Sequence, residues 1–251
     1  MGCNRSYAHS ARIRLPHFIK PYFHEENKKS RKAANKSVRQ ASEDVPNGAH
    51  YRNLYDSYKI DDFGLLTEKS VMAHCNFVDE KDGEIFVETG TAVAHCPISN
   101  AYFANGVIPI KRLKEQGVEI GLGTDISGGF SPSLWDNIKQ AVMSSRMLED
   151  GVDVTRTQDT RGVADSRISV IEAFSLATQG GGEALSLPIG VIEKGYACDL
   201  QVVDMNATGA SLSGFGVFNE PADQLQKLLY LATPTNIKQV WVQGKLVHEK
   251  Y

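Results

Sequence analysis

The sequence predicts an α/β fold, in which a parallel sheet or (β/α) barrel is followed by a small, separate β unit. Two observations carry this prediction. Apolar runs of strand length alternate with helical patterns between residues 65 and 185, and this alternation is typical of parallel strands joined by crossover helices. After residue 190 the expected strands have no helical pattern between them, which indicates a second unit built from strands alone.

The composition is that of an ordinary globular chain. Of the 251 residues, 41% are hydrophobic and 23% are charged, and the formal net charge is −3. This charge predicts neither a nucleic-acid partner nor attraction to an anionic membrane. No apolar run is long enough to span a membrane, and the four cysteines show no CxxC pairing and no disulfide-rich density. We therefore expect a cytoplasmic protein without a membrane span.

Three regions follow from the composition along the chain. Residues 1–50 are rich in Lys, Arg, Asn and Ser, and we expect an irregular N-terminal segment there. A remnant of an earlier barrel strand is expected near residues 12–23, although Pro16 argues against a central place in a sheet. Residues 51–190 are expected to form the main α/β domain, and residues 191–251 the small β domain.

Local signals place the individual elements. Gly90 and Gly117 are expected to stop helices, and a serine N-cap with proline in the first turn is expected to open the long helix. A hairpin is expected to turn at Gln243-Gly244. The expected elements, in chain order, are a strand at 70–75, a helix at 79–90, a strand at 91–96, a loop at 97–100, a helix at 108–116, a strand at 118–124, a helix at 131–148, a continuous helix at 170–185, a strand at 199–204 and the hairpin at 237–247.

Three expected strands of the main domain end at residues of types that can serve as metal ligands. The first two strands end at His74 and His95, and the third leads directly into Asp125. Because the C-terminal ends of parallel strands meet at one edge of a sheet, these side chains are expected to lie near each other. Glycines follow Asp125, so the backbone there can approach a ligand closely.

Histidine and aspartate at strand ends suit zinc chemistry. A bound divalent ion generates hydroxide near neutral pH, and a neighbouring carboxylate can move a proton to a leaving group. Each residue also has a purely structural explanation. A lone histidine at a strand end can be a hydrogen-bonded structural residue, His95 can serve the packing of the loop after it, and Asp125 can begin a turn or cap a helix.

Several motifs resemble those of the amidohydrolase superfamily, and within it the guanine deaminase family. The Gly-Gly-Phe-Ser-Pro-Ser segment after Asp125 favours guanine deaminases over adenosine- and triazine-type relatives. The resemblance runs from about residue 50 to the C-terminus, so that it covers only the C-terminal portion of such an enzyme. The matching stretches are Leu65–His74, Ala94–Asn100, Gly121–Ser133, Leu176–Thr178, Gly190 with Gly195–Leu200, and Val240–Val247.

The resemblance implies the C-terminal half of a (β/α)8 TIM-like barrel plus a small β domain, and a homo-oligomer. It implies a Zn2+-dependent reaction that converts guanine and water to xanthine and ammonia. Asp125 would be a zinc ligand and proton shuttle, and His74 a catalytic residue that contacts the substrate or the metal-bound water. The family's His-x-Ser-Glu-Asn motif matches Glu26 and Asn27 directly, which implies a catalytic and substrate-binding role for Glu26. Its zinc-binding histidine corresponds to His24 only across a one-residue gap.

One motif of the superfamily is absent from the sequence. The first barrel strand of these enzymes carries a His-x-His pair that supplies two zinc ligands, and no such pair occurs among the histidines at 9, 17, 24, 50, 74, 95 and 248. A complete barrel takes about 250 residues, so we expect a truncated barrel whose deamination would need ligands from another polypeptide or a longer product. The alternatives are a non-catalytic amidohydrolase fragment that acts through subunit association, and an amidohydrolase that deaminates or dehalogenates another heterocycle.

Overall fold

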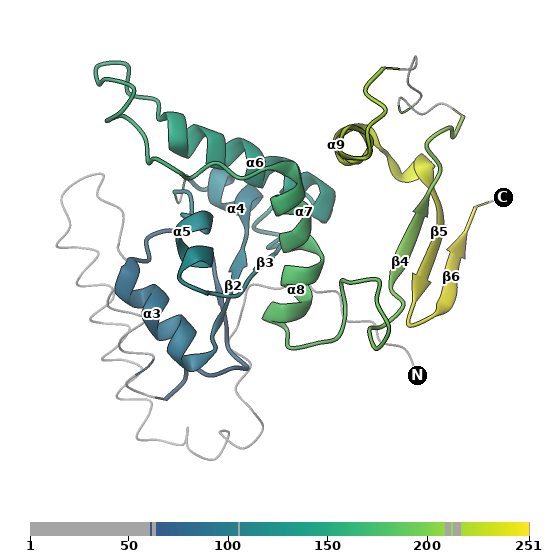
Figure 1. Cartoon of the computed structure of the whole chain (residues 1–251), viewed down its shortest axis with the longest axis horizontal. Helices are drawn as coiled ribbons and strands as arrows, with labels where there is room; N and C mark the ends of the chain where they lie inside the picture. Colours follow the sequence, from purple (N-terminus) through teal and green to yellow (C-terminus); the bar gives the residue numbers. More distant parts are fainter. Residues whose placement is uncertain (1–60, 62–63, 105, 209–211, 213–216, 251) are drawn as a thin grey trace.

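The computed structural model describes residues 61, 64–104, 106–208, 212 and 217–250. Within them the chain forms a three-stranded parallel sheet and a three-stranded antiparallel sheet, accompanied by helices (Figure 1). The predictions for residues 1–50, including the strand remnant and its site residues, fall outside the described part of the chain. No helix of the described part is long and apolar enough to cross a membrane.

The parallel sheet has the strand order β1-β2-β3, with bounds Val71–Ala73, Ala92–His95 and Ile120–Leu122. Ala73 pairs with Ala94, which in turn pairs with Gly121, so the C-terminal ends of the three strands lie level with one another. The predicted parallel α/β arrangement is therefore confirmed. Within the residues placed by the structure, these strands do not close into a barrel.

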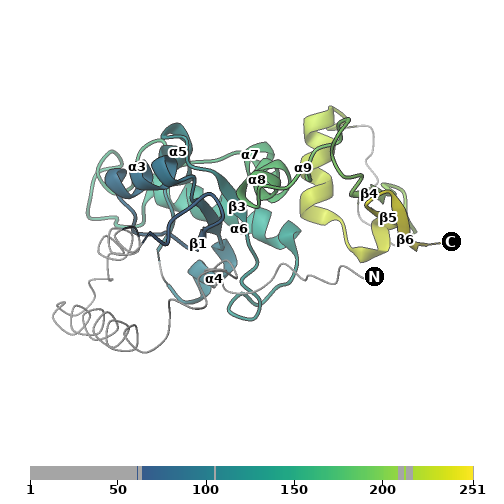
Figure 2. The ribbon, with the colours of Figure 1, turned by 90° about the horizontal axis from the view of Figure 1, so that it is seen from below.

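Helices cover one face of this sheet and bury a single core against it. Val93 and Ile120 are paired and therefore share a face, and both belong to a buried cluster with Phe86, Leu113 and Ile138 of three helices. Figure 2 shows α3 and α5 side by side along the sheet. Within the main domain, the core receives side chains from α3 (Glu80–Thr89), α5 (Ile110–Glu115), α6 (Leu134–Asp150) and α7 (Val170–Ala177).

Capping residues set the ends of these helices, as the sequence predicts. Asp79 and Asp82 form a reciprocal capping box at the start of α3, and Gly90 ends it with φ of 68°. The predicted N-cap Ser131 with proline in the first turn is wrong for the long helix α6, which begins two residues later, so that Pro132 lies before the N-cap. Its N-cap is Ser133, whose Oγ accepts a hydrogen bond from the backbone N of Asp136 at 3.4 Å.

Two further predictions in the main domain are wrong. The expected loop at 97–100 is the first part of helix α4 (Pro97–Tyr102), because Pro97 occupies the first turn, where a missing N–H costs nothing. The expected continuous helix at 170–185 is two helices, α7 and α8 (Gln179–Ala184), which meet at Thr178. Thr178 has φ −118° and ψ −91°, which interrupts the helical hydrogen-bond series.

The small antiparallel sheet contains β4 (Leu200–Val203), β5 (Ile237–Val242) and β6 (Lys245–Glu249). The predicted hairpin is confirmed, since Gln243 and Gly244 both have positive φ, 50° and 72°, as a tight primed turn requires. The prediction that no helix separates these strands is wrong. Between β4 and β5 lie α9 (Pro221–Leu231) and a short 3-10 helix (Pro234–Asn236).

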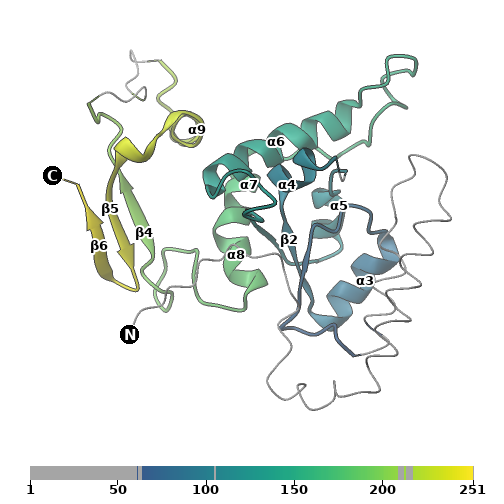
Figure 3. The same cartoon turned by 180° about the vertical axis from the view of Figure 1, so that it is seen from behind.

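Helix α9 links the small sheet to the main core. Leu229 is fully buried and belongs to the same hydrophobic cluster as the parallel sheet. Leu225 and Leu228 pack against that cluster from the same helix, a spacing typical of an amphipathic helix. Figure 3 shows α9 between α6 and the small sheet.

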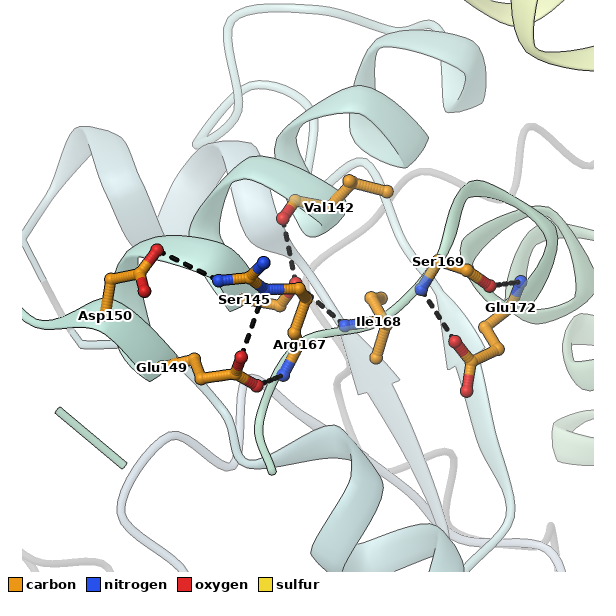
Figure 4. A network of polar contacts seen from close by, with 8 residues as sticks. All are labelled: Val142, Ser145, Glu149, Asp150, Arg167, Ile168, Ser169 and Glu172. Carbon is orange, nitrogen blue, oxygen red and sulfur yellow. Dashed lines mark hydrogen bonds and ion pairs between the residues drawn. The ribbon is translucent and has the colours of Figure 1, made fainter. Parts of the chain in front are cut away.

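A polar network holds the start of α7 against the end of α6 (Figure 4). The Arg167 guanidinium lies 3.1 Å from Glu149 Oε1 and 3.0 Å from Asp150 Oδ2. The backbone N of Ile168 donates to Ser145 Oγ at 3.1 Å. These contacts join the two ends of the loop at residues 151–166 and thereby orient α7 on the core.

Candidate active site

His74 and Asp125 approach each other at the C-terminal edge of the parallel sheet. His74 follows β1 and Asp125 lies three residues beyond β3. The distance between His74 Nε2 and Asp125 Oδ2 is 3.7 Å. Both side chains keep partial access to solvent, 33% for His74 and 14% for Asp125. The structure thus brings together two of the residues singled out from the sequence, in a place that is open to solvent.

The backbone at both strand ends is in the left-handed region. His74 has φ of 69°, Cys75 of 48° and Asp125 of 48°. Residues other than glycine take this conformation at a cost of roughly 1–2 kcal/mol each, and such strain is concentrated at functional sites. Here the conformation lets the chain leave the sheet while the two side chains stay within reach of each other.

Both the carboxylate and the backbone carbonyl of Asp125 accept hydrogen bonds from groups close to them in space. Ser99 Oγ donates to Asp125 Oδ2 at 2.6 Å, and the Asp125 carbonyl accepts from the backbone N of Gly129 at 2.6 Å. A Cβ at Gly128 would lie only 2.7 Å from Asp125 Oδ2. Gly128 therefore allows a close approach to the Asp125 carboxylate, whereas the expected approach of the backbone to a ligand stays a prediction.

The imidazole of His74 is held by one asparagine, which a second asparagine holds in turn. Its Nδ1 lies 2.8 Å from Asn100 Oδ1, and Asn100 Nδ2 donates to Asn76 Oδ1 at 2.8 Å. Reasoning from the sequence missed Ser99 and Asn100 as site residues, because it assigned them to a loop. The signal that could have found them is their place directly after the end of β2, within the matched stretch Ala94–Asn100.

His95 does not join this pair. It lies two residues after Val93 on β2, so its side chain points to the helix-covered face. It is 1% exposed, and neither ring nitrogen has a hydrogen-bond partner among the described residues. Burial, with a smaller effect of His74, lowers the pKa of His95 to about 3. A neutral, enclosed imidazole fits the packing explanation for His95 better than a metal-binding one.

The described residues do not by themselves fit a zinc ion. Zinc takes about four ligands, three of them from the protein in catalytic sites. The described part of the chain holds no group of three or more His, Cys, Asp or Glu that could bind a metal. Burial raises the pKa of the Cys75 and Cys96 thiols to about 12, which keeps both protonated. Asp125 and His74 thus offer two donors.

Known proteins share both the sequence and the fold of this chain. The sequence pattern of the amidohydrolase family matches residues 25–247. Guanine deaminase of Mus musculus is 36% identical over 208 residues, which cover 78% of this chain and 43% of the mouse protein. The chain therefore spans less than half the length of this relative.

Solved structures of deaminases are similar to this chain as well. Guanine deaminase from C. acetobutylicum, with guanine bound in its active site, superposes with a TM-score of 0.62 at 25% identity and covers 76% of this chain and 42% of its own. An adenosine deaminase from Xanthomonas campestris with bound zinc superposes with a TM-score of 0.60 at 24% identity, covering 75% and 39%. The second likeness concerns the fold alone. Together, these similarities confirm the resemblance found in the motifs.

Proposed function

Because the chain belongs to the amidohydrolase family, we propose that it forms the His74–Asp125 part of a guanine-deaminating site. The reaction would convert guanine and water to xanthine and ammonia. The observation that carries this proposal is the 3.7 Å approach of His74 Nε2 to Asp125 Oδ2 at the C-terminal edge of the sheet. The identity of 36% with a guanine deaminase supports guanine as the substrate, as does the Gly-Gly-Phe-Ser-Pro-Ser segment after Asp125.

The proposed chemistry assigns a separate task to each side chain. Deamination forms a C–O bond from water to the amino-bearing carbon, breaks the C–N bond and passes water protons to the departing amine. Asp125 Oδ2 would accept a proton from the attacking water and return it to the amine, which is general acid–base catalysis. His74 Nε2 would hold the water or the substrate by a hydrogen bond. Ser99 keeps the carboxylate oriented throughout, through its 2.6 Å bond.

Zinc belongs to this proposal as an expectation. When bound, zinc lowers the pKa of a water molecule toward neutrality. Asp125 and, outside the described residues, His24 are its proposed ligands, and Glu26 is a proposed catalytic and substrate-binding residue. The base and hydrogen-bonding roles of Asp125 and His74 are argued from their own positions. The homo-oligomer implied by the motifs stays a prediction.

Xanthine formation by the full chain, followed chromatographically, tests the proposal. Where turnover is found, with the chain alone or with a polypeptide that supplies the missing ligands, guanine should be converted in preference to adenosine or a chlorinated triazine. Asp125→Asn should lower the rate about 100- to 10,000-fold, the range for loss of a general acid–base group. Asp153→Asn is the matched control, because Asp153 lies on an exposed loop. Full turnover by Asp125→Asn would contradict the role of Asp125, and preference for another heterocycle would contradict the substrate.

An absence of turnover would favour one of the alternative functions. If the folded chain converts none of the three compounds, even with zinc added, then the alternative of a non-catalytic amidohydrolase that acts through subunit association is favoured. Sedimentation or light scattering would then show whether the chain associates with itself.

A further inference from the structure

We propose that Asn100, itself held by Asn76, is a positioning residue that fixes the tautomer of His74. In this tautomer Nδ1 carries the proton, and the lone pair of Nε2 faces the Asp125 carboxylate. Asn100 is 2% exposed and Asn76 is 8% exposed, so water does not readily replace either partner. The inference concerns the protonation pattern of the imidazole and holds whichever substrate the site takes.

The first step is the contact between His74 and Asn100. An amide oxygen can only accept a hydrogen bond, and a neutral imidazole has one N–H and one lone pair. Because Asn100 Oδ1 lies 2.8 Å from His74 Nδ1, the proton must be on Nδ1. The other nitrogen, Nε2, is then an acceptor when the ring is neutral.

The second step is the orientation of the Asn100 amide, which the network decides. Asn100 Nδ2 donates to Asn76 Oδ1 at 2.8 Å. If the Asn100 amide turned over alone, its oxygen would meet the Asn76 oxygen, and two acceptors would face each other in a buried place. A buried acceptor without a donor is strongly disfavoured. With the Asn76 amide placed so that its Oδ1 faces Asn100, Asn76 holds Asn100 in the orientation that selects the tautomer of His74.

The third step is the position of α4, whose consecutive residues Ser99 and Asn100 hold both groups of the site. Ser99 Oγ donates to Asp125 Oδ2 at 2.6 Å, and this is the oxygen that lies 3.7 Å from His74 Nε2. Nε2 and Oδ2 are then two acceptors 3.7 Å apart. A group that binds to both must supply two hydrogens, and both the attacking water and the departing amine have them. This last consequence rests on the proposed function, whereas the tautomer does not.

Long-range 1H–15N NMR of the full chain with 15N-labelled histidine tests the tautomer directly. The measurement is made well above the ordinary imidazole pKa, so that the rings are neutral, and His74→Gln identifies the resonances of His74. We expect a protonated Nδ1 and an unprotonated Nε2 in the native chain. A native His74 with its proton on Nε2 would overturn the inference.

Three variants separate positioning from mere packing. Asn100→Leu removes the acceptor for Nδ1 and should move the proton of His74 toward Nε2. Asn76→Leu should act in the same way, because Asn100 is then free to turn over, and it gives the test if Asn100→Leu does not fold. Asn76→Asp keeps an acceptor for Asn100 Nδ2 and should keep the native tautomer. An unchanged tautomer in both leucine variants would refute the role of Asn100.

The rate of guanine conversion provides an independent reading. The leucine variants should lose about 10- to 100-fold, the effect typical of groups that orient a functional imidazole, and Asn76→Asp should retain most of the native rate. If the tautomer is as stated but the native chain does not convert guanine, the proposed function fails and this inference stands. If guanine is converted but the proton is on Nε2, this inference alone fails.

Discussion

Replacing Gly180 with alanine should destabilise the protein, whereas the same replacement at Gly181 should stabilise it. Both glycines lie in α8, which packs directly on β3. A Cβ at Gly180 would lie 2.4 Å from the carbonyl oxygen of Ile120, while a Cβ at Gly181 would meet only Leu176 O, at 3.8 Å. The neighbouring strand shows the same closeness, because a Cβ at Gly121 would lie 3.0 Å from Gly181 Cα. Here two backbones touch without side chains between them.

The magnitudes follow from these distances. Ordinary contact begins at 3.4 Å, so Gly180→Ala requires α8 to move from β3 by 3.4 − 2.4 = 1.0 Å. Overpacking of this kind typically costs about 1–3 kcal/mol. The better helix propensity of alanine offsets about 0.5–1 kcal/mol of this cost. Gly181→Ala has the propensity gain without the clash. We expect a loss of up to about 2.5 kcal/mol for Gly180→Ala, centred near 1 kcal/mol, and a gain of about 0.5–1 kcal/mol for Gly181→Ala.

Urea unfolding followed by circular dichroism measures both changes. In thermal unfolding they correspond to shifts of roughly 2–4 °C per kcal/mol for a chain of this size, in opposite directions. Equal shifts of the same sign for the two variants would show that α8 does not contact β3 as closely as described.

Three further predictions concern charge. Arg167→Met should lower the free energy of unfolding by less than about 1 kcal/mol, because the ion pairs of Arg167 are partly exposed. This loss should be smaller in high salt. Arg156→Met is the control: the ion pair of Arg156 is exposed and longer, so its loss should not measurably change the free energy of unfolding. Burial raises the pKa of Glu172, but hydrogen bonds from Ser169, together with the charges of Lys111 and Lys114, outweigh it and hold that pKa below its ordinary value. The ionised side chain therefore stabilises the fold above the ordinary glutamate pKa, and urea unfolding should show Glu172→Gln to be destabilising at neutral pH but not in acid. Burial lowers the pKa of His95 to about 3, so the unfolded chain binds more protons than the folded chain between about pH 3 and pH 6.5. Stability should therefore fall by about 1.4 kcal/mol for each unit by which the pH is lowered within this window. His95→Phe should remove that dependence, and an unchanged pH profile of urea unfolding would contradict it.

Several elements could be predicted from the sequence because their signals are local. The helix from Glu80 to Thr89 needs only its capping aspartates and the glycine that follows. The hairpin needs only two residues able to take positive φ at its turn. The three strand ends were found because an apolar run beside a single histidine or aspartate can be recognised without knowing its neighbours.

Other features could not be predicted because they depend on residues far apart in the chain. Whether residues 221–231 form a helix is decided by the burial of Leu229 in a core made by residues before 180. Ser99 and Asn100 become site residues only because they reach Asp125 and His74, each 26 residues away.

The amino-acid sequence thus determined the family, the parallel order of strands and helices, and the presence of His74 and Asp125 at strand ends, since periodicity, caps and motifs are written in neighbouring residues. Only the tertiary structure decided which strand-end side chains meet. A strand alternates its side chains between two faces, and the helices that cover one of them enclosed His95 while His74 and Asp125 stayed together at the open edge.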